Sequence, residues 1–333
     1  MAIEPLILSI ALSDNDLTQP LIRGSVAVQG VRLLPTVVHP SEMFWRQLKY
    51  SDFDVSEMSL SSLLIAAERG DDRFVALPVY TVRRFFHTGI LVRADRGISR
   101  PQDLRGRKVG VPEYQQTSAL WSRGILQHEF GVHPGEVDWY MERNPHKSHG
   151  GATGFVPPPG VRLHQIPEST NIGRMLQAGE LDATLLYLGR QNLVDRSTID
   201  LSADPKIVPL FADAQAESRR YFAKTGLYPI NHAVVVKREL LARHPWLALN
   251  LYNAFAAAKA QVQNVARNAL RPYIDAGLMP ADAAQALDGD PRPYGFRSAR
   301  PVLETIAQYV HEQGLAQRRL PVEELFAPST LDT

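Results

Sequence analysis

One junction in the chain constrains its fold more than any other segment. Residues 108–112 form a short valine-containing run that ends at Pro112, residues 113–116 are polar, and a helical pattern starts at Thr117. A strand that passes into a helix through a polar turn leaves the first N–H groups of the helix unpaired above the turn. These N–H groups and the helix dipole favour an anionic ligand such as a carboxylate or phosphate. The junction therefore predicts an α/β fold with an anion-binding turn, or only an ordinary strand–helix connection.

The same alternation of strand, turn and helix recurs along the chain, which predicts mostly parallel, doubly wound sheets. In the first part, helices are expected to follow a cap at Ser41 and to span 59–69. The expected strands lie at 6–12, 31–38, 54–58 and 74–80, then at 108–112, 137–141, 161–166 and 181–188. The expected later helices lie at 117–130, 172–178, 244–270, 281–287 and 301–313.

Two apolar, β-rich segments could connect two lobes. Residues 87–93 would carry the chain into a second lobe and residues 228–236 would return it. The predicted division is lobe I from 1–88 plus 233–333, with a C-terminal helical extension, and lobe II from 89–232. A pair of connections makes a hinge, and the cleft between hinged lobes is a usual place for a ligand. The pattern predicts a two-lobed fold like that of periplasmic binding proteins.

Composition narrows the classes of partner. Of the 333 residues, 44% are hydrophobic and 21% are charged, as in a globular protein of about two domains. The formal net charge of +1 and the lack of a basic, aromatic-interleaved tract make nucleic acid and membrane unexpected partners. Cysteine is absent, which excludes disulfides and thiolate chemistry. The first residues lack a signal-peptide pattern, so a cytoplasmic location is expected.

Two histidines fall in the expected connections. His87 lies at the edge of the first and His232 lies in the second. If the connections are adjacent, both imidazoles face the cleft, where an ordinary pKa of about 6.5 suits an acid or a base. The alternative is that either one only packs. Arg83 and Arg84 precede His87, and one of them is expected to point inward and hold a carboxylate, while the sequence does not say which.

Further polar residues lie where strands pass into helices. Ser59 begins a helix after an apolar strand and is either a second anion-binding start or a simple N-cap. Asp14 follows the first strand, at the sheet edge where open α/β proteins bind ligands, or else it only caps the next helix. The candidate substrate-binding residues of the 108–121 junction are Glu113, Tyr114, Gln115, Gln116 and Thr117.

Residues 144–160 are rich in glycine, proline and histidine. His146 and His149 have a spacing compatible with a metal, but no carboxylate lies close by in sequence, so no metal is expected. The favoured interpretation is a mobile surface connection. P-loop, dinucleotide-binding and G-x-S-x-G motifs are absent, so neither a nucleotide cofactor nor serine hydrolysis is predicted.

Taken together, these segments resemble the 4,5-dihydroxyphthalate decarboxylases, enzymes with the type II periplasmic-binding-protein fold. The resemblance covers nearly the whole chain. The Gly-Val-Pro part of the junction is common among binding-protein relatives, whereas the Pro-Glu-Tyr-Gln turn, residues 83–87 and the C-terminal segment are more specific. The matching segments are 53–59, 83–87, 103–115, 121–132, 157–161, 228–232, 290–295, 311–315 and 318–328.

The resemblance implies a cytoplasmic carboxy-lyase that acts without a cofactor, most simply on 4,5-dihydroxyphthalate to give protocatechuate. A para-hydroxylated aromatic acid can lose CO2 when the ring carbon that carries the carboxylate is protonated. Ser59, Arg83 and the helix start at 115–117 would bind carboxylate, and His87 and His232 would share the proton-donor and phenol-base roles in either order. The resemblance also implies a homo-oligomer.

One segment departs from the family pattern. The turn after the first strand, residues 13–18, lacks the tyrosine and arginine that are typical of the family, which leaves the identity of the substrate open. Two alternative functions remain: a binding protein for a small aromatic or carboxylate solute, and a different cytosolic lyase on the same fold, such as a chorismate-dehydratase-like enzyme or a pyrimidine synthase of thiamine biosynthesis.

Overall fold

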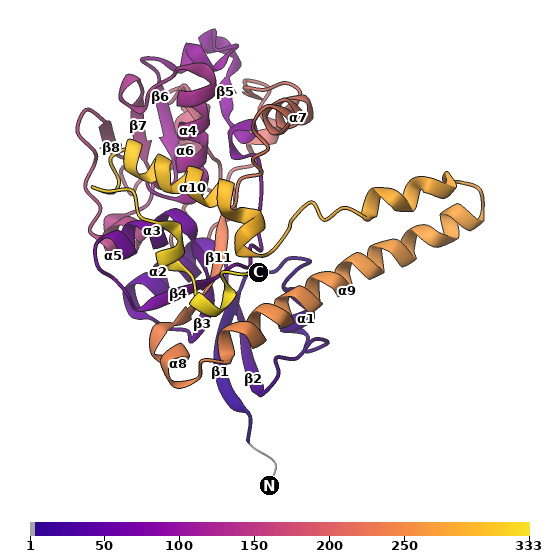
Figure 1. Ribbon diagram of the computed structural model, residues 1–333. Helices are drawn as coiled ribbons and strands as arrows, with labels where there is room; N and C mark the ends of the chain where they lie inside the picture. The colour runs from indigo at the N-terminus through magenta and orange to yellow at the C-terminus, as the bar shows by residue number, and fades with distance from the viewer. Residues whose placement is uncertain (1–3) are drawn as a thin grey trace.

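Two separate β-sheets organise the chain, of which the structure, a computed structural model, describes residues 4–333 (Figure 1). We call the five-stranded sheet and its helices lobe I, and the six-stranded sheet and its helices lobe II. The first sheet has the order β2-β1-β3-β11-β4. Its strands are β1 (Leu6–Leu12), β2 (Val31–Val37), β3 (Val55–Ser59), β4 (Phe74–Leu77) and β11 (His232–Lys237).

The sheet of lobe II has the order β10-β5-β9-β6-β7-β8. In both sheets the strands that alternate with helices run parallel, while β11 in lobe I and β5 and β10 in lobe II run antiparallel to their neighbours. The strands of lobe II are β5 (Leu91–Arg93), β6 (Lys108–Val111), β7 (Asp138–Met141), β8 (Arg162–Gln165), β9 (Ala183–Thr184) and β10 (Ile207–Pro209).

Helices pack on the sheets through their apolar faces. The helices are α1 (Gln19–Ile22), α2 (Pro40–Tyr50), α3 (Leu60–Glu68), α4 (Thr117–Phe130), α5 (His149–Thr153), α6 (Ile172–Ala178), α7 (Ala214–Thr225), α8 (Arg238–Arg243), α9 (Leu247–Asp275) and α10 (Phe296–Glu312). In α2, Met43, Phe44 and Leu48 recur at helical spacing and are all buried, so this amphipathic helix packs its apolar face on the core.

The two segments that connect the sheets lie side by side at residues 82–84 and 229–231, so the first pairs just before the predicted connection 87–93. Arg83 and Ile230 form an antiparallel bridge. The amide of Arg84 donates to the carbonyl of Pro229 at 3.1 Å, and the amide of Asn231 donates to the carbonyl of Val82 at 2.9 Å. The two segments therefore form a short two-stranded link.

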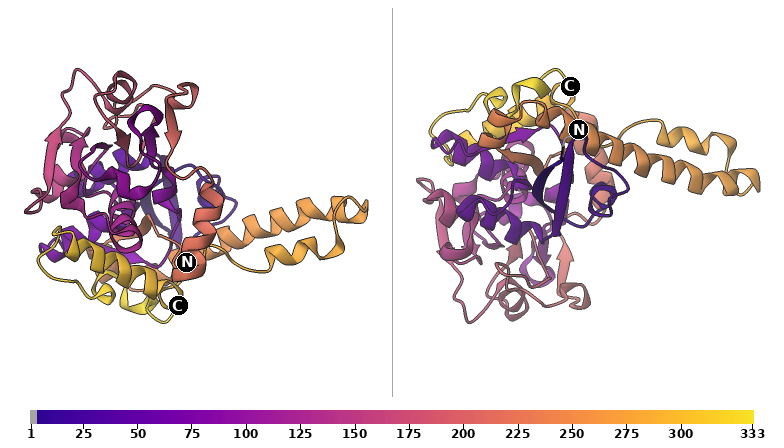
Figure 2. Two further views of the ribbon diagram at one scale, coloured as in Figure 1. Left: turned by 90° about the horizontal axis from the view of Figure 1, so that it is seen from above. Right: turned by 90° about the horizontal axis from the view of Figure 1, so that it is seen from below.

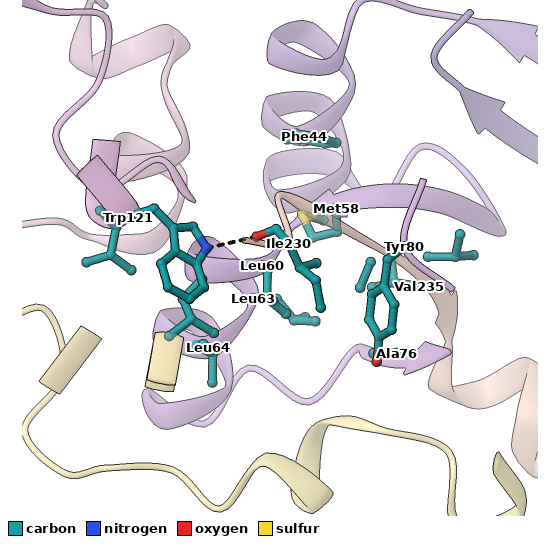
Figure 3. Packing of buried hydrophobic residues seen from close by; sticks show 14 of the residues in the cluster. Phe44, Met58, Leu60, Leu63, Leu64, Ala76, Tyr80, Trp121, Ile230 and Val235 are labelled. Atoms are coloured by element: carbon teal, nitrogen blue, oxygen red, sulfur yellow. Dashed lines mark hydrogen bonds between the residues drawn. The ribbon is translucent and has the colours of Figure 1, made fainter. Parts of the chain in front are cut away.

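A core of buried side chains reaches across this link. The indole N–H of Trp121, on α4 of lobe II, donates to the carbonyl of Ile230 at 2.9 Å, close to Leu60 and Leu64 of α3 (Figure 3). Helix α10 lies across both lobes, because it contacts α3 of lobe I and α4 of lobe II (Figure 1). The lobes are therefore joined by more than their connecting segments.

Helix α9 extends away from the rest of the protein (Figures 1 and 2). Ala258 is the last buried residue of α9. The second half of the helix pairs with the 3-10 helix Ala281–Leu287, and the two together form a projecting arm. The sequence predicts these two helices but does not predict that they project from the protein. The hydrophobic pattern does not say which apolar residues pack against another element.

Three expected local features differ from the structure. The N-cap of α2 is His39, whose ring accepts a hydrogen bond from the amide of Ser41, and not Ser41 itself. The predicted strand 181–188 pairs only at Ala183–Thr184, because the chain then leaves the sheet to line a cavity between the lobes. Residues 144–160 are not a loose surface connection, since they contain α5 with His149 and Gly150 buried.

Candidate functional site

A cavity of about 240 Å³ lies between the lobes, beside the two connecting segments. This volume is below the range of about 300–1,000 Å³ common for drug-sized ligands, so a single-ring molecule is the expected size of occupant. Lobe I, the connections and lobe II all contribute side chains. The lining residues are His39, Pro40, Ser41, Phe44, Ser59, Val82, Arg84, Phe86, Gln116, Thr117, Ser118, Arg143, His149, Leu186, Leu188, Asn231 and His232.

Three helices begin at this cavity. They are α2 after His39, α3 after Ser59 and α4 after Gln116. Helix α4 has no side-chain cap, so its first N–H groups remain for a ligand. The N-terminal ends of the three helix dipoles give the cavity a positive electrostatic potential that does not depend on a charged side chain. Such a potential favours the binding of a carboxylate.

Hydroxyl groups join the α3 and α4 starts. The Thr117 hydroxyl accepts from the amide of Ser61 at 3.0 Å and lies 2.9 Å from the hydroxyl of Ser59. The Ser61 hydroxyl donates to the carbonyl of Gln115 at 2.6 Å. Ser59 lines the cavity, and its hydroxyl belongs to a hydrogen-bond network between the lobes and does not cap α3.

His232 lies in the cavity wall with a buried carboxylate behind it. Its Nδ1 is 3.6 Å from Oε2 of Glu57, which is fully buried on the neighbouring strand β3. Oε2 of Glu57 also accepts from the hydroxyl of Ser13 at 2.6 Å. The amide nitrogen of Asn231 is 2.7 Å from Nε2 of His232, so the network assigns the Nδ1 proton to the side of Glu57. The separation is longer than a hydrogen bond, and Nδ1 of His232 is buried without a hydrogen-bond partner among the described residues, so the carboxylate faces the ring without yet being bonded to it.

Arg143 is the centre of a second buried network. Its Nη1 donates to Glu113 at 2.8 Å and its Nε donates to Asp195 at 2.7 Å, while Nη2 donates to the hydroxyl of Ser41 at 2.5 Å. Burial acts to raise the pKa of both carboxyl groups, but neighbouring positive charge and hydrogen bonds, those of Arg143 among them, hold each pKa below its ordinary value. Both carboxylates are therefore charged, and Arg143 is already neutralised.

His149 joins this network to the α3 hydroxyls. Its Nε2 lies 3.4 Å from Nη1 of Arg143 and its Nδ1 lies 3.2 Å from the hydroxyl of Ser62. Burial lowers the pKa of His149, so it is neutral near pH 7. The ring of Phe44 makes edge contacts with two of the cavity histidines, with centroid distances of 4.6 Å to His232 and 5.6 Å to His149.

The structure reverses the expectation for the two adjacent arginines. Arg83 is buried away from the cavity, where its guanidinium donates to the carbonyls of Tyr228 at 3.2 Å and Pro293 at 2.8 Å. Arg84 is exposed and lines the cavity. The extended connection turns successive side chains to opposite sides, so only one of the pair can face inward.

The histidines do not meet as expected. His87 lies in a 3-10 helix (Phe86–Gly89), fully buried, with Nε2 at 3.0 Å from Glu217 and its ring against Tyr221. It is not among the side chains that line the cavity. Burial lowers the pKa of His87, which favours the neutral form. His149, and not His87, lines the cavity together with His232.

The other predicted binding residues divide into two groups. Gln116 and Thr117 line the cavity. Glu113, Tyr114 and Gln115 are buried behind it, and Asp14 is exposed outside it with a hydrogen bond to Gln19. Glu113 supports the site through Arg143, whereas Tyr114 stacks on the guanidinium of Arg123 at 3.7 Å.

Sequence reasoning missed most of the wall opposite α4. His39, Ser41, Phe44, Arg143 and His149 are cavity residues that the pattern does not mark. The only signal was the His146 and His149 pair, of which His149 is buried in the cavity wall and His146 is exposed. Within residues 4–333 no group of three or more metal-ligating side chains is arranged to hold an ion, and no helix there is long and apolar enough to cross a membrane.

The two lobes, with a cavity between them at which helices begin, have the fold of the periplasmic binding proteins. Residues 30–153 match a family model described as "ABC transporter, phosphonate, periplasmic substrate-binding protein". The fold resembles the alkanesulfonate-binding protein SsuA of Xanthomonas axonopodis pv. citri (TM-score 0.58, 13% identity, 98% of this chain and 99% of that chain). It also resembles the desulfurization enzyme DSZB (TM-score 0.54, 16% identity, 97% of each chain).

Within that class, the chain belongs to the 4,5-dihydroxyphthalate decarboxylase family. It is 33% identical over 331 residues to the 4,5-dihydroxyphthalate decarboxylase of Comamonas testosteroni, with 98% of each protein covered. It is 36% identical over 192 residues to the enzyme of that name from Pseudomonas putida, over 56% of this chain and 74% of that protein. The resemblance predicted from the sequence is confirmed.

Proposed function

We propose that this protein is a decarboxylase of a hydroxylated aromatic acid, with 4,5-dihydroxyphthalate as substrate, protocatechuate as product and only its own side chains as catalytic groups. The observation that carries the proposal is His232 in the cavity wall with the buried carboxylate of Glu57 behind it. A protein that only binds a solute needs an anion clamp and has no use for a carboxylate-backed imidazole. Proton transfer does need one.

The anionic groups of the substrate fit the cavity by charge. The helix starts at Ser59 and Gln116–Ser118 would hold the carboxylates through N–H and hydroxyl groups. Arg84, which lines the cavity, would bind a substrate carboxylate through two N–H groups of its guanidinium. Phe44 and Phe86 supply apolar walls for the ring.

The reaction then needs two proton transfers. His149, neutral at pH 7, would accept the proton of the hydroxyl group para to the departing carboxylate. The phenolate would push an electron pair toward the ring carbon, which takes a proton from His232. The bond from that carbon to the carboxylate then breaks, CO2 leaves, and the electron pair restores the aromatic ring. The phenolate of the product then takes its proton back from His149, and solvent returns one proton to His232 in each turnover.

Glu57 would act through His232. Its carboxylate, 3.6 Å from Nδ1, would hold the ring of His232 in the orientation that donates the proton, and the hydrogen bond from Ser13 would hold the carboxylate in place. Protein groups around the cavity would replace water around the departing carboxylate and favour its loss as neutral CO2.

The test is incubation with 4,5-dihydroxyphthalate, with CO2 and protocatechuate measured together. In D2O the product should carry one deuterium at the vacated ring carbon. His232→Gln should lower kcat by about 10²–10⁴-fold, the usual contribution of a general acid. His164→Gln, on an exposed histidine of β8 outside the cavity, is the matched control. No turnover of any hydroxylated phthalate by the wild type would refute the proposal.

A further inference from the structure

Contacts across the cleft hold the lobes together around the cavity. The Ser61–Gln115 hydrogen bond, at 2.6 Å, and the Arg143–Ser41 hydrogen bond, at 2.5 Å, each join a group of lobe I to a group of lobe II. The indole of Trp45 on α2 also donates to the carbonyl of His146 at 3.2 Å. Most of these groups are buried, so a hinge opening would expose them one after another.

Helix α10 braces the same two lobes from outside. The ring of Tyr309 packs edge-on against Trp121 with centroids 5.5 Å apart, and the side chain of Gln313 accepts from Arg123 at 2.9 Å and donates to the carbonyl of Leu120 at 3.1 Å. Because α10 also packs on α3, rotation of one lobe against the other would break these contacts. A route that leaves the lobes in place would preserve all of these contacts.

A larger space adjoins the cavity on the side of lobe II. We call this space of about 830 Å³ the outer chamber. It shares Arg84, Phe86 and Leu186 with the cavity, so these side chains form the boundary between the two. Its other walls come from the start of β5 and from residues 187–209.

The outer chamber presents positive charge. Arg84 and Arg190 both line it and are exposed, and neither forms an ion pair with a carboxylate among residues 4–333. The one carboxylate in the wall, Asp200, has an oxygen that accepts from the amide of Ser202 at 2.9 Å and from its hydroxyl at 2.6 Å. The Tyr187 hydroxyl donates to the carbonyl of Ile199 at 2.7 Å, and this hydrogen bond joins two segments of the chamber wall.

We propose that the outer chamber is an entrance site for aromatic dicarboxylates. The anion docks between Arg84 and Arg190 and then passes between Phe86 and Leu186 into the cavity, while the lobes stay braced. The chemical class of the ligand rests on the proposed function. The entrance route does not rest on the proposed function, because it is argued from the boundary that the outer chamber shares with the cavity and from the contacts between the lobes.

Phthalate tests the route without turnover, since it has both carboxylates and no hydroxyl group to drive decarboxylation. We expect Arg190→Gln to lower the association rate constant of phthalate about fivefold at low salt, the effect of one charge on a dianion at roughly 8 Å in water. The effect should disappear near 1 M salt, where the Debye length falls to about 3 Å. Arg32→Gln on β2 removes the same charge far from the chamber and should change little.

A second variant blocks the chamber itself. Thr198 is exposed in the chamber wall, and Thr198→Trp should slow both association and dissociation of phthalate. Equal association rates in the wild type, Arg190→Gln and Thr198→Trp would overturn the proposal, as would an equal effect of Arg32→Gln. If these rates change as expected but 4,5-dihydroxyphthalate is not decarboxylated, the entrance stands and the proposed function fails.

Discussion

Replacement of Arg143 by methionine should destabilise the protein by an amount that depends on pH. The side chain is buried, and so are its partners Glu113 and Asp195, at 2.8 and 2.7 Å. Removal of one partner from a buried ion pair costs about 3–5 kcal/mol because the remaining charge loses its compensation. With a urea m value of about 3 kcal/mol/M, the denaturation midpoint should fall by roughly 1–1.7 M at pH 8.

The sign of the pH effect follows from the carboxyl groups. In the wild type their pKa values are held below the ordinary 3.8 and 4.5, so their stabilisation is present above that range and is lost as the pH falls through it. Without Arg143, each carboxyl group loses a contribution that lowers its pKa while the burial that raises the pKa remains, so the folded state gains stability relative to the unfolded state as these groups take up protons. The difference between wild type and variant should therefore shrink from pH 8 to pH 5.

Urea denaturation at several pH values measures this difference. Arg46→Met is the matched control, because Arg46 also pairs with two carboxylates, Glu42 at 3.4 Å and Asp52 at 2.8 Å, but is partly exposed. Such surface pairs contribute about 0–1 kcal/mol. A loss below about 1 kcal/mol for Arg143→Met, or one that stays constant from pH 8 to pH 5, would refute this account of the network.

Three further predictions concern single side chains. Glu57→Gln should lower kcat by on the order of 10²-fold, within the range for loss of acid–base catalysis, but leave phthalate affinity within about twofold, and a parallel loss of both would contradict a role through His232. His87→Gln should lower the free energy of unfolding by about 1–3 kcal/mol, because the buried contact with Glu217 is lost, and should leave kcat nearly unchanged. A large loss of kcat in a folded His87→Gln variant would show that His87 is a catalytic residue after all. Gly124→Ala should cost about 1–3 kcal/mol in urea denaturation, because its Cβ would overlap the ring of Tyr309, and wild-type stability would show that α10 can move aside.

The elements that depend on local periodicity were predictable from the sequence. The junction at 108–121 forms β6 and α4 as expected, and Gln116 and Thr117 line the cavity because the turn itself places them there. His232 also lies where expected, since its place in β11 follows from an apolar, β-branched run.

The parts that depend on contacts between distant segments were not predictable. The choice between Arg83 and Arg84 requires the phase of an extended segment relative to a cleft, which alternation alone does not fix. Arg143 and His149 become site residues through partners such as Ser41 and Asp195, which are far from both in sequence. No local pattern identifies such partners in a single sequence.

The order of strands in lobe I bears on how the chain folds during synthesis. Strand β4 pairs with β11, which begins about 150 residues later at His232, and Ala76 of β4 bridges Phe326 later still. All six strands of lobe II come from residues 91–209, so its sheet can form on the ribosome while the first sheet is unfinished. At about 5–20 residues per second, β3 and β4 wait on the order of ten to thirty seconds for β11. The lobe that is made first is thus the lobe that is completed last, and its open edges during that interval are where a nascent chain would need a chaperone.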